Sequence, residues 1–197
     1  MRKTILLLML SVLGGILYAQ RADNAIALHA KFGTMETFKW KGEGKGQILK
    51  DLPSMASLGG QWFIGQKGYL FEGNFIMQDF SIDYEEINKV LPYRLYGINV
   101  MGGWSLEDLN PFYLNIKAGG FAGYYVVNNA ERKENVYNTT FSNPVEGITY
   151  GAMGEVEAEM VIYKKLSGVF SYSQYYYPLD KWIRWQYATQ VGLKWYF

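Results

Sequence analysis

The sequence predicts an all-β fold, an eight-stranded antiparallel up-and-down β-barrel of the outer-membrane type. Three observations lead to this prediction. Apolar and polar residues alternate with a period of two through eight segments, short and long connections alternate between these segments, and aromatic residues form 17% of the chain, including 17 Tyr and 6 Trp. Barrels in contact with lipid place such aromatic residues at the two bilayer interfaces.

The N-terminal segment has the composition of an export signal. Arg2 and Lys3 supply positive charge, residues 5–17 form an apolar stretch, and Ala19 offers a small residue at the predicted cleavage site. This apolar run is shorter than the about 20 residues of a membrane-spanning helix, which favours a removed signal over an anchor. We therefore expect a signal peptide over residues 1–19 and one outer-membrane-type barrel domain over residues 20–197.

Alternation is clearest in two segments near the C-terminus. In residues 147–162 one face carries Glu155, Glu157 and Glu159, and the opposite face carries apolar or small residues. A helix would scatter these glutamates around its circumference, whereas a strand places all three on one side. Residues 183–197 alternate in the same way. The other alternating segments are 26–32, 58–64, 69–78, 96–104, 112–118 and, least regularly, 168–177.

The connections between these segments are of two kinds. Short connections are predicted at residues 65–68, 105–111 and 163–167, and they alternate with long polar stretches at residues 34–55, 79–92 and 128–146. The connection at residues 178–182 is of moderate length. Short periplasmic turns and long outer loops are typical of outer-membrane barrels. We expect an outer-membrane location in contact with lipid, and the alternative is a periplasmic β-sandwich.

The chain ends in the strand-like sequence QVGLKWYF, without a polar tail. A final strand with an open edge can pair with the first strand, which closes the barrel and removes both edges. The spacing of Gln190, Gly192, Trp195 and Phe197 resembles the C-terminal targeting signal of bacterial outer-membrane barrels. That resemblance implies recognition by the barrel assembly machinery.

Charged residues fall on the inward faces of several predicted strands. An eight-stranded barrel is filled by its side chains, and charges buried there must be paired. We therefore expect a paired polar core rather than a wide channel. The alternative is a cation path or divalent-ion site at the three glutamates. The predicted core consists of His29, Lys31, Lys117, Glu155, Glu157, Glu159 and Lys194.

The chain lacks the residues that most kinds of catalysis and cofactor binding require. The chain has no Cys, one His and a formal net charge of +1, so disulfides, Cys/His metal sites and the basic stripe of a nucleic-acid binder are not expected. His29 is not accompanied by a nucleophile-elbow sequence. We expect no enzyme activity, no cofactor and no direct nucleic-acid binding, and the alternative is a lipid-modifying enzyme that uses His29.

Aromatic residues cluster around the last hairpin. We expect them to lie on the outer wall as part of an interfacial girdle, and the alternative is a sugar- or partner-binding patch. The residues are Tyr175, Tyr176, Tyr177, Trp182 and Trp185.

The last third of the chain has a recognisable order of elements. It runs through GITYGAMG at residues 147–154, a glutamate-rich strand at 155–160, a short Lys-containing turn, a strand leading to Trp182 or Trp185, and the terminal VGLKWYF. This order resembles the conjugative transposon protein TraO family of Bacteroidetes, and Gln20 and Arg21 after the signal are also similar. The resemblance implies a non-enzymatic outer-membrane component of a DNA transfer apparatus, with other conjugal transfer proteins as partners. The alternative is a general OmpA-like stability or adhesion barrel. The gene neighbourhood would distinguish the two, because a transfer component should lie within a run of other transfer genes.

Overall fold

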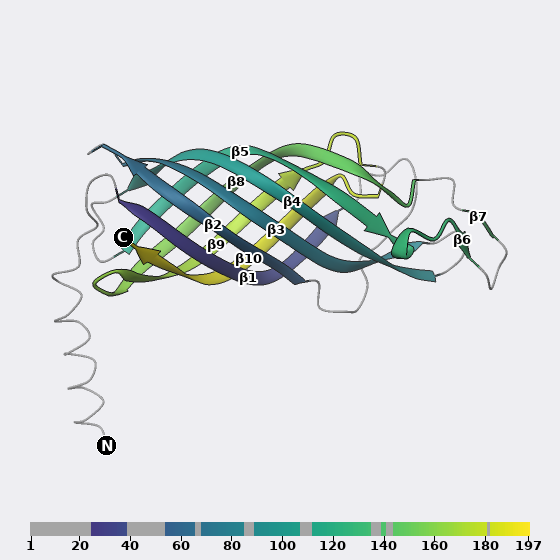
Figure 1. The fold of residues 1–197 in the computed structure, drawn as a ribbon, viewed down its shortest axis with the longest axis horizontal. Helices are drawn as coiled ribbons and strands as arrows, with labels where there is room; N and C mark the ends of the chain where they lie inside the picture. The colour runs from purple at the N-terminus through teal and green to yellow at the C-terminus, as the bar shows by residue number, and fades with distance from the viewer. Residues whose placement is uncertain are drawn as a thin grey trace, which may run out of the picture.

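The computed structural model describes residues 25–38, 54–65, 68–84, 89–106, 112–134, 139–140, 144–180 and 182–197. Eight antiparallel strands within these ranges close into a barrel, in the order β1-β10-β9-β8-β5-β4-β3-β2 (Figure 1). The prediction of an eight-stranded antiparallel barrel is confirmed. The strands are β1 (Ile26–Phe38), β2 (Ser54–Ile64), β3 (Tyr69–Tyr84), β4 (Lys89–Leu106), β5 (Phe112–Val127), β8 (Glu146–Tyr163), β9 (Leu166–Tyr176) and β10 (Trp185–Tyr196).

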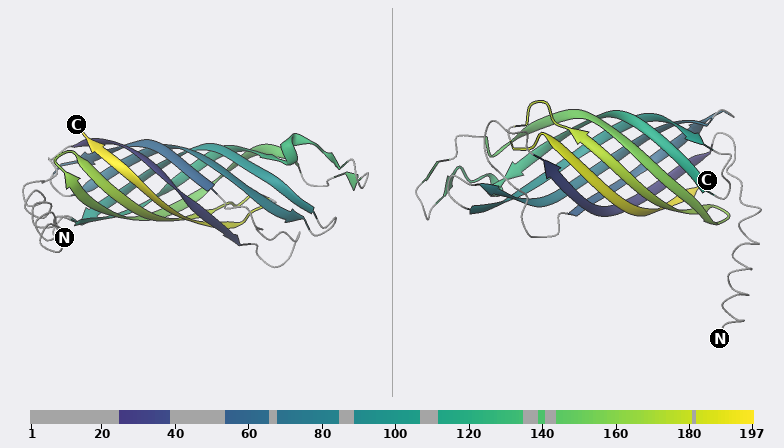
Figure 2. Two further views of the ribbon diagram at one scale, coloured as in Figure 1. Left: turned by 90° about the horizontal axis from the view of Figure 1, so that it is seen from below. Right: turned by 180° about the vertical axis from the view of Figure 1, so that it is seen from behind.

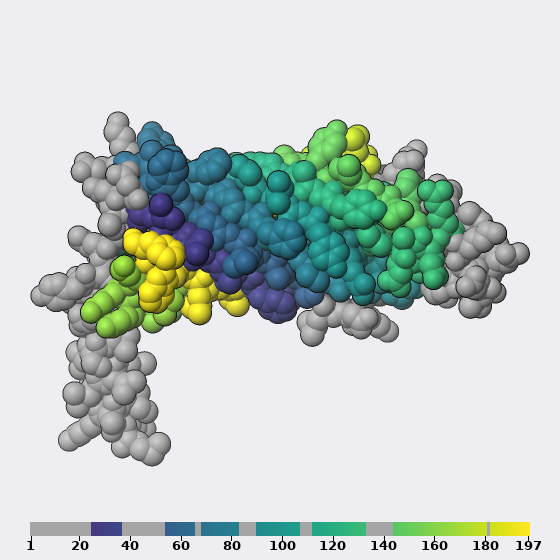
Figure 3. Space-filling model, viewed as in Figure 1, coloured from purple at the N-terminus to yellow at the C-terminus, as the bar shows by residue number. Residues whose placement is uncertain are grey.

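Side chains alternate between the lumen and the outer wall along each strand, as a period of two requires. In β10, for example, Gln190 and Lys194 are buried while Val191, Leu193 and Trp195 are exposed. Figure 3 shows side chains of β2, β3 and β4 covering one face of the outer wall. Exposed aliphatic and aromatic residues occur on all eight strands, far more than the isolated patches of a water-soluble monomer. The outer wall therefore suits contact with hydrocarbon.

Helical structure is confined to one short turn in the part of the chain that the structure describes. This turn is η1 (Asn128–Ala130), which precedes a small hairpin of β6 (Lys133–Glu134) and β7 (Thr139–Thr140). No helix among these residues has the length and apolar character needed to cross a membrane.

One end of the barrel carries the short turns and the C-terminus (Figure 2). Gly65 and Gly68 adopt φ of 67° and 72°, a region that glycine enters without steric cost. The backbone N–H of Ser105 donates to the Gly68 carbonyl at 2.8 Å, which ties this turn to the end of β4. By the rule for outer-membrane barrels, this turn end faces the periplasm.

The strands extend much further at the opposite end than the sequence predicts. The predicted long connection at residues 79–92 is wrong in extent, because β3 continues to Tyr84, β4 begins at Lys89, and these two residues are paired. Pro92 lies within β4, opposite Ser81. The outward residues become polar here, at Asp79 and Arg94, so the loss of apolar alternation marks where the wall leaves the membrane and not where the strands end. In Figure 1, β3, β4, β5 and β8 extend beyond the other strands at this loop end.

Two glycines permit the first and last strands to meet. A Cβ placed on Gly33 of β1 would lie 1.8 Å from the Thr189 carbonyl oxygen, and one on Gly192 of β10 would lie 2.2 Å from that of Ala30. Real side chains do not tolerate such distances, so the β1–β10 seam needs glycine at both positions. By contrast, a Cβ on Gly102, which faces outward, would meet no atom within 4 Å.

Candidate functional site

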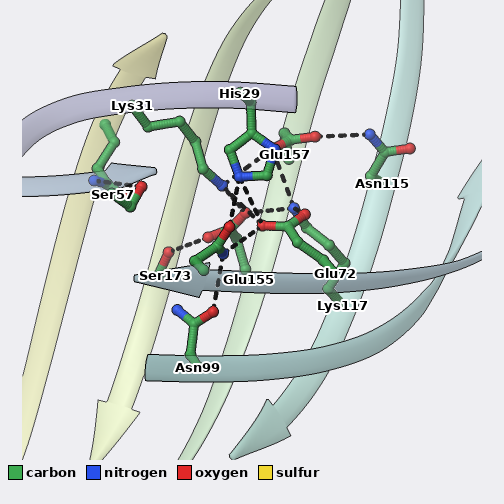
Figure 4. Close-up of polar contacts among 12 residues, drawn as sticks. His29, Lys31, Ser57, Glu72, Asn99, Asn115, Lys117, Glu155, Glu157 and Ser173 are labelled. Atoms are coloured by element: carbon green, nitrogen blue, oxygen red, sulfur yellow. Dashed lines mark hydrogen bonds and ion pairs between the residues drawn. The ribbon is translucent and has the colours of Figure 1, made fainter. Parts of the chain in front are cut away.

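A layer of charged side chains lies in the lumen (Figure 4). These residues belong to the halves of their strands that are nearest the turn end. The structure places every predicted core residue inside the barrel. It also adds Glu72 of β3, which is fully buried and which the predicted core omitted, although the alternation of β3 already places it inward. The layer thus holds four carboxylates and three ammonium groups. The predicted members are His29, Lys31, Lys117, Glu155, Glu157, Glu159 and Lys194.

Two lysines each contact the same three carboxylates. The ammonium group of Lys31 lies 2.7 Å from Glu155, 3.2 Å from Glu157 and 3.4 Å from Glu72. Lys117 reaches them from the other side of the barrel, at 2.6 Å from Glu72, 2.6 Å from Glu155 and 3.1 Å from Glu157. Oxygens of these carboxylates lie within 4.8 Å of one another, a spacing that a metal ion would also suit. The lysines, however, already supply the positive charge between them, which disfavours the divalent-ion reading.

The third lysine anchors the last strand to the same layer. Lys194 of β10 donates to Glu157 at 2.6 Å and to Glu159 at 2.9 Å. The Tyr196 hydroxyl also donates to Glu159, and Asn115 donates to Glu157 at 2.9 Å. Glu157 therefore accepts from groups on three other strands, and it is the central acceptor of the layer.

His29 lies at the edge of this layer, where it is part of a hydrogen-bonded network. Its Nε2 lies 2.6 Å from Oδ1 of Asn74, whose amide in turn donates to Glu72 at 2.7 Å and to Asn99 at 2.9 Å. With the Asn74 amide donating in this direction, Nε2 is the donor to its oxygen. Ser57 is hydrogen-bonded to Gln190 at 3.4 Å. The geometry thus joins His29 to amides and a carboxylate rather than to a nucleophile.

Apolar layers lie on both sides of the charged layer. At the turn end the buried cluster is Ala25, Ala27, Phe63, Leu70 and Tyr196. At the loop end a larger buried cluster includes Met35, Met55, Met101, Met153 and Phe121, together with the aromatic residues of β4, β5 and β9. The charged layer therefore lies between two apolar layers.

The connection between β9 and β10 closes the loop end. The Asp180 carboxylate accepts from the backbone N–H groups of Trp182 at 2.7 Å and Ile183 at 3.2 Å, and from the Tyr93 hydroxyl at 2.9 Å. The Trp182 indole donates to the Pro144 carbonyl at 2.8 Å. These contacts fold residues 178–180 and 182–184 onto the lumen as a plug, with Asp180, Trp182 and Ile183 buried.

This plug overturns part of the predicted aromatic girdle. Tyr175, Tyr177 and Trp182 are 1%, 0% and 3% exposed and lie inside the barrel. Consecutive residues of a strand point to opposite sides, so three tyrosines in a row cannot all face lipid. Only Tyr176 and Trp185 lie on the outer wall, with their ring centroids 4.6 Å apart.

The predicted assembly signal occupies the closing strand. Gln190 points inward, Gly192 lies at the seam, and Trp195 and Phe197 are exposed on the outer wall. The backbone N–H of Phe197 donates to the Ile26 carbonyl at 3.0 Å, which extends the pairing with β1 to the last residue. Recognition by the assembly machinery stays a prediction, and the predicted cleavage site at Ala19 lies outside the described residues.

The plug should respond to pH through Asp180. Burial raises the pKa of the Asp180 carboxyl above its ordinary 3.8, against the opposing effect of its N–H and O–H donors. The stability that this group contributes is complete below pH 3.8 and is lost as the pH rises through the higher folded-state pKa. Relative to Asp180→Asn, the wild type should therefore gain free energy of unfolding as the pH is lowered from neutrality. Urea unfolding followed by tryptophan fluorescence measures this, and a difference that does not change with pH would contradict it.

Comparison with known proteins identifies the fold. No protein-family model matches the chain, and no curated protein matches its sequence. The crystal structure of Neisserial surface protein A matches with a TM-score of 0.58 and 11% identity, over 87% of this chain and 97% of that one. Ail, the attachment invasion locus protein of Yersinia pestis, matches with a TM-score of 0.53 and 10% identity, over 89% of this chain and 100% of that one. At these identities the likeness shows the fold alone, that of the eight-stranded outer-membrane barrels.

Proposed function

We propose that this barrel is a non-enzymatic outer-membrane component of a conjugative transposon DNA transfer apparatus. The observation that carries the proposal is the order of elements in the last third of the sequence, which resembles the TraO family. In the structure these elements are the consecutive strands β8, β9 and β10, the last of which closes the barrel against β1. The exposed apolar residues on all eight strands support residence in the outer membrane.

The filled lumen supports a scaffolding role rather than a conduit. Two apolar layers and the plug enclose the charged layer, and eight-stranded barrels are just wide enough to be filled by side chains. In this proposal DNA does not pass through the barrel. The protein instead contributes its extracellular loops and its periplasmic end to contacts with other transfer proteins.

The buried position of His29 supports the absence of catalysis. Its ring is 2% exposed and donates to Asn74, within a layer closed on both sides. A lipid hydrolase or acyltransferase needs its base within reach of a nucleophile and a substrate. His29→Gln keeps an N–H donor for Asn74 and removes any basic imidazole, so it tests the enzyme alternative directly.

DNA transfer frequency from a donor with a clean in-frame deletion of the gene tests the proposal. We expect transfer to be lost in the deletion strain and restored by the full chain and by the His29→Gln chain. A chain lacking Phe197 should not restore it, because it loses the last hydrogen bond to β1 and the terminal aromatic ring. Phe197→Tyr keeps both and serves as the matched control.

The outcomes separate the candidate functions. Unchanged transfer in the deletion strain would overturn the conjugation role and leave a general stability or adhesion barrel. Failure of His29→Gln alone, with a normal heat-modifiable band on a gel, would favour the enzyme. Restoration by the chain lacking Phe197 would remove the terminal residue from the assembly signal.

A further inference from the structure

The outer wall of the barrel is grooved over β5, β8, β9 and β10. The groove has a volume of about 580 Å³, and its floor is formed where β8 carries the small residues Ala152 and Gly154. These residues are paired with Gly120 and Ala118 of β5, so small side chains continue across the neighbouring strand. The behind view in Figure 2 shows this side of the barrel, with β8, β9 and β10 next to one another.

The two sides of the groove are lined by different kinds of residue. On one side stand Ile116 and Val156, both aliphatic and about half exposed. On the other side β9 and β10 contribute Tyr172, Tyr176 and Trp185, and the rings of Tyr176 and Trp185 have their centroids 4.6 Å apart. The outward-facing residues that line the groove are thus small, aliphatic or aromatic, apart from Gln174, and the aromatic ridge lies toward the loop end. Lys117, Met153 and Glu155 also line it, but they are buried and belong to the inward faces of β5 and β8.

The position of the groove places it in the outer leaflet. Gly154 lies in the loop-end half of β8, and Tyr176 and Trp185 stand where β9 and β10 leave the wall. Tyr and Trp prefer this interfacial depth, because one part of each ring system is apolar and another is polar. A groove open to hydrocarbon at this depth is filled by an acyl chain or by another barrel.

A cation marks the loop-end rim. Arg184 directly precedes Trp185, is exposed, and uses Nη1 to donate to the Pro178 carbonyl at 2.8 Å. A guanidinium group has five N–H donors in a planar fork that suits phosphate. The donors not engaged with Pro178 leave Arg184 able to contact an anion above the groove. Apolar floor and cationic rim together match an anionic lipid rather than a second copy of this wall, which would bring two arginines toward each other.

We propose that the groove binds an acyl chain of an outer-leaflet lipid whose phosphate-bearing head group contacts Arg184. The chain lies over Ala152 and Gly154, between the aliphatic wall and the aromatic ridge. This site is independent of the role in DNA transfer, because it depends only on the barrel standing in a membrane.

Filling the groove tests the acyl-chain part. A Cβ on Gly154 would meet its nearest atom at 3.8 Å, and one on Gly73, on the outer wall of β3, at 4.0 Å. Gly154→Leu therefore fills the groove without a backbone clash, and Gly73→Leu is the matched control outside it. Both variants should show the wild-type heat-modifiable band, which establishes that they fold.

The readout is native mass spectrometry, which measures the lipid that each variant retains. The protein is extracted from vesicles of phosphatidylglycerol or of phosphatidylcholine with the same acyl chains. We expect the wild type and Gly73→Leu to retain phosphatidylglycerol roughly tenfold more than phosphatidylcholine, the change expected from one charge-assisted hydrogen bond. Gly154→Leu should lose the retained lipid. Arg184→Gln should retain both lipids equally.

Three results would overturn all or part of the proposal. Equal lipid retention by Gly154→Leu and Gly73→Leu would show that the groove holds no specific lipid. A two-barrel species in the wild type that Gly154→Leu removes would assign the groove to a second copy of the chain. A preference for phosphatidylglycerol that survives in Arg184→Gln would remove Arg184 from the head-group contact.

Discussion

Replacing Glu157 with leucine will lower the free energy of unfolding of the barrel by about 3–5 kcal/mol, the cost of breaking a buried ion pair from one side. Glu157 is fully buried and accepts from Lys31, Lys117 and Lys194. Leucine removes the one acceptor that all three ammonium groups share, so each of these buried groups loses a partner that leucine cannot replace. Urea unfolding of the protein in lipid vesicles, followed by tryptophan fluorescence and gel mobility, measures the change.

Two controls make this result specific to buried charge. Asp79 and Arg94 form an ion pair at 3.4 Å on the outer surface, where both side chains are more than 40% exposed, so Asp79→Asn should change the free energy of unfolding by about 1 kcal/mol or less. In the double variant Glu157→Leu with Lys194→Met, removal of the ammonium group that has lost its nearest acceptor should recover part of the loss. If Glu157→Leu costs no more than Asp79→Asn, the charged layer does not hold the barrel together.

Gly33→Val will prevent closure of the barrel. A Cβ at this position would overlap the Thr189 carbonyl of β10 at 1.8 Å, and β1 cannot move away without losing its pairing with the last strand. We expect little or no heat-modifiable barrel after refolding into lipid. Because Gly33 lies outside the predicted C-terminal signal, the defect reports the seam itself and not recognition by the assembly machinery.

Gly102→Val is the matched control for the seam. It makes the same chemical change within a strand, but its Cβ would meet no atom within 4 Å. It should fold with a yield close to that of the wild type, since valine also favours strands more than glycine does. Equal yields from the two valine variants would mean that the seam tolerates a side chain and that closure does not depend on Gly33.

The sequence was most informative where one physical rule acts alone. Period-two alternation assigns inward and outward faces correctly along residues 26–32 of β1 and residues 185–195 of β10, because each face meets a different medium. The same alternation would also have corrected two parts of the prediction. It places Glu72 inward, and it forbids Tyr175, Tyr176 and Tyr177 from sharing the outer wall, yet composition suggested a common girdle.

The sequence does not predict which charged residues pair with each other across the lumen. Lys31 and Glu155 are 124 residues apart and meet at 2.7 Å only because the barrel closes with a particular stagger between strands. Alternation fixes the face of each residue but not its height in the lumen. The sequence mispredicts the ends of β3 and β4 for a related reason. An outward polar residue such as Asp79 marks the membrane boundary, but the hydrogen-bonded pairing of the two strands continues beyond it.

The placement of the lysines predicts an order of events during membrane insertion. Lys31 belongs to the first strand and Lys194 to the last, whereas their nearest carboxylate partners, Glu155, Glu157 and Glu159, stand on β8. A strand that entered the bilayer by itself would carry unpaired charge through hydrocarbon, at about 2.5–3.5 kcal/mol for each group on insertion scales. The pathway of least cost is therefore concerted: the curved sheet assembles with its charges turned inward, and the two outermost strands meet as the lysines find β8.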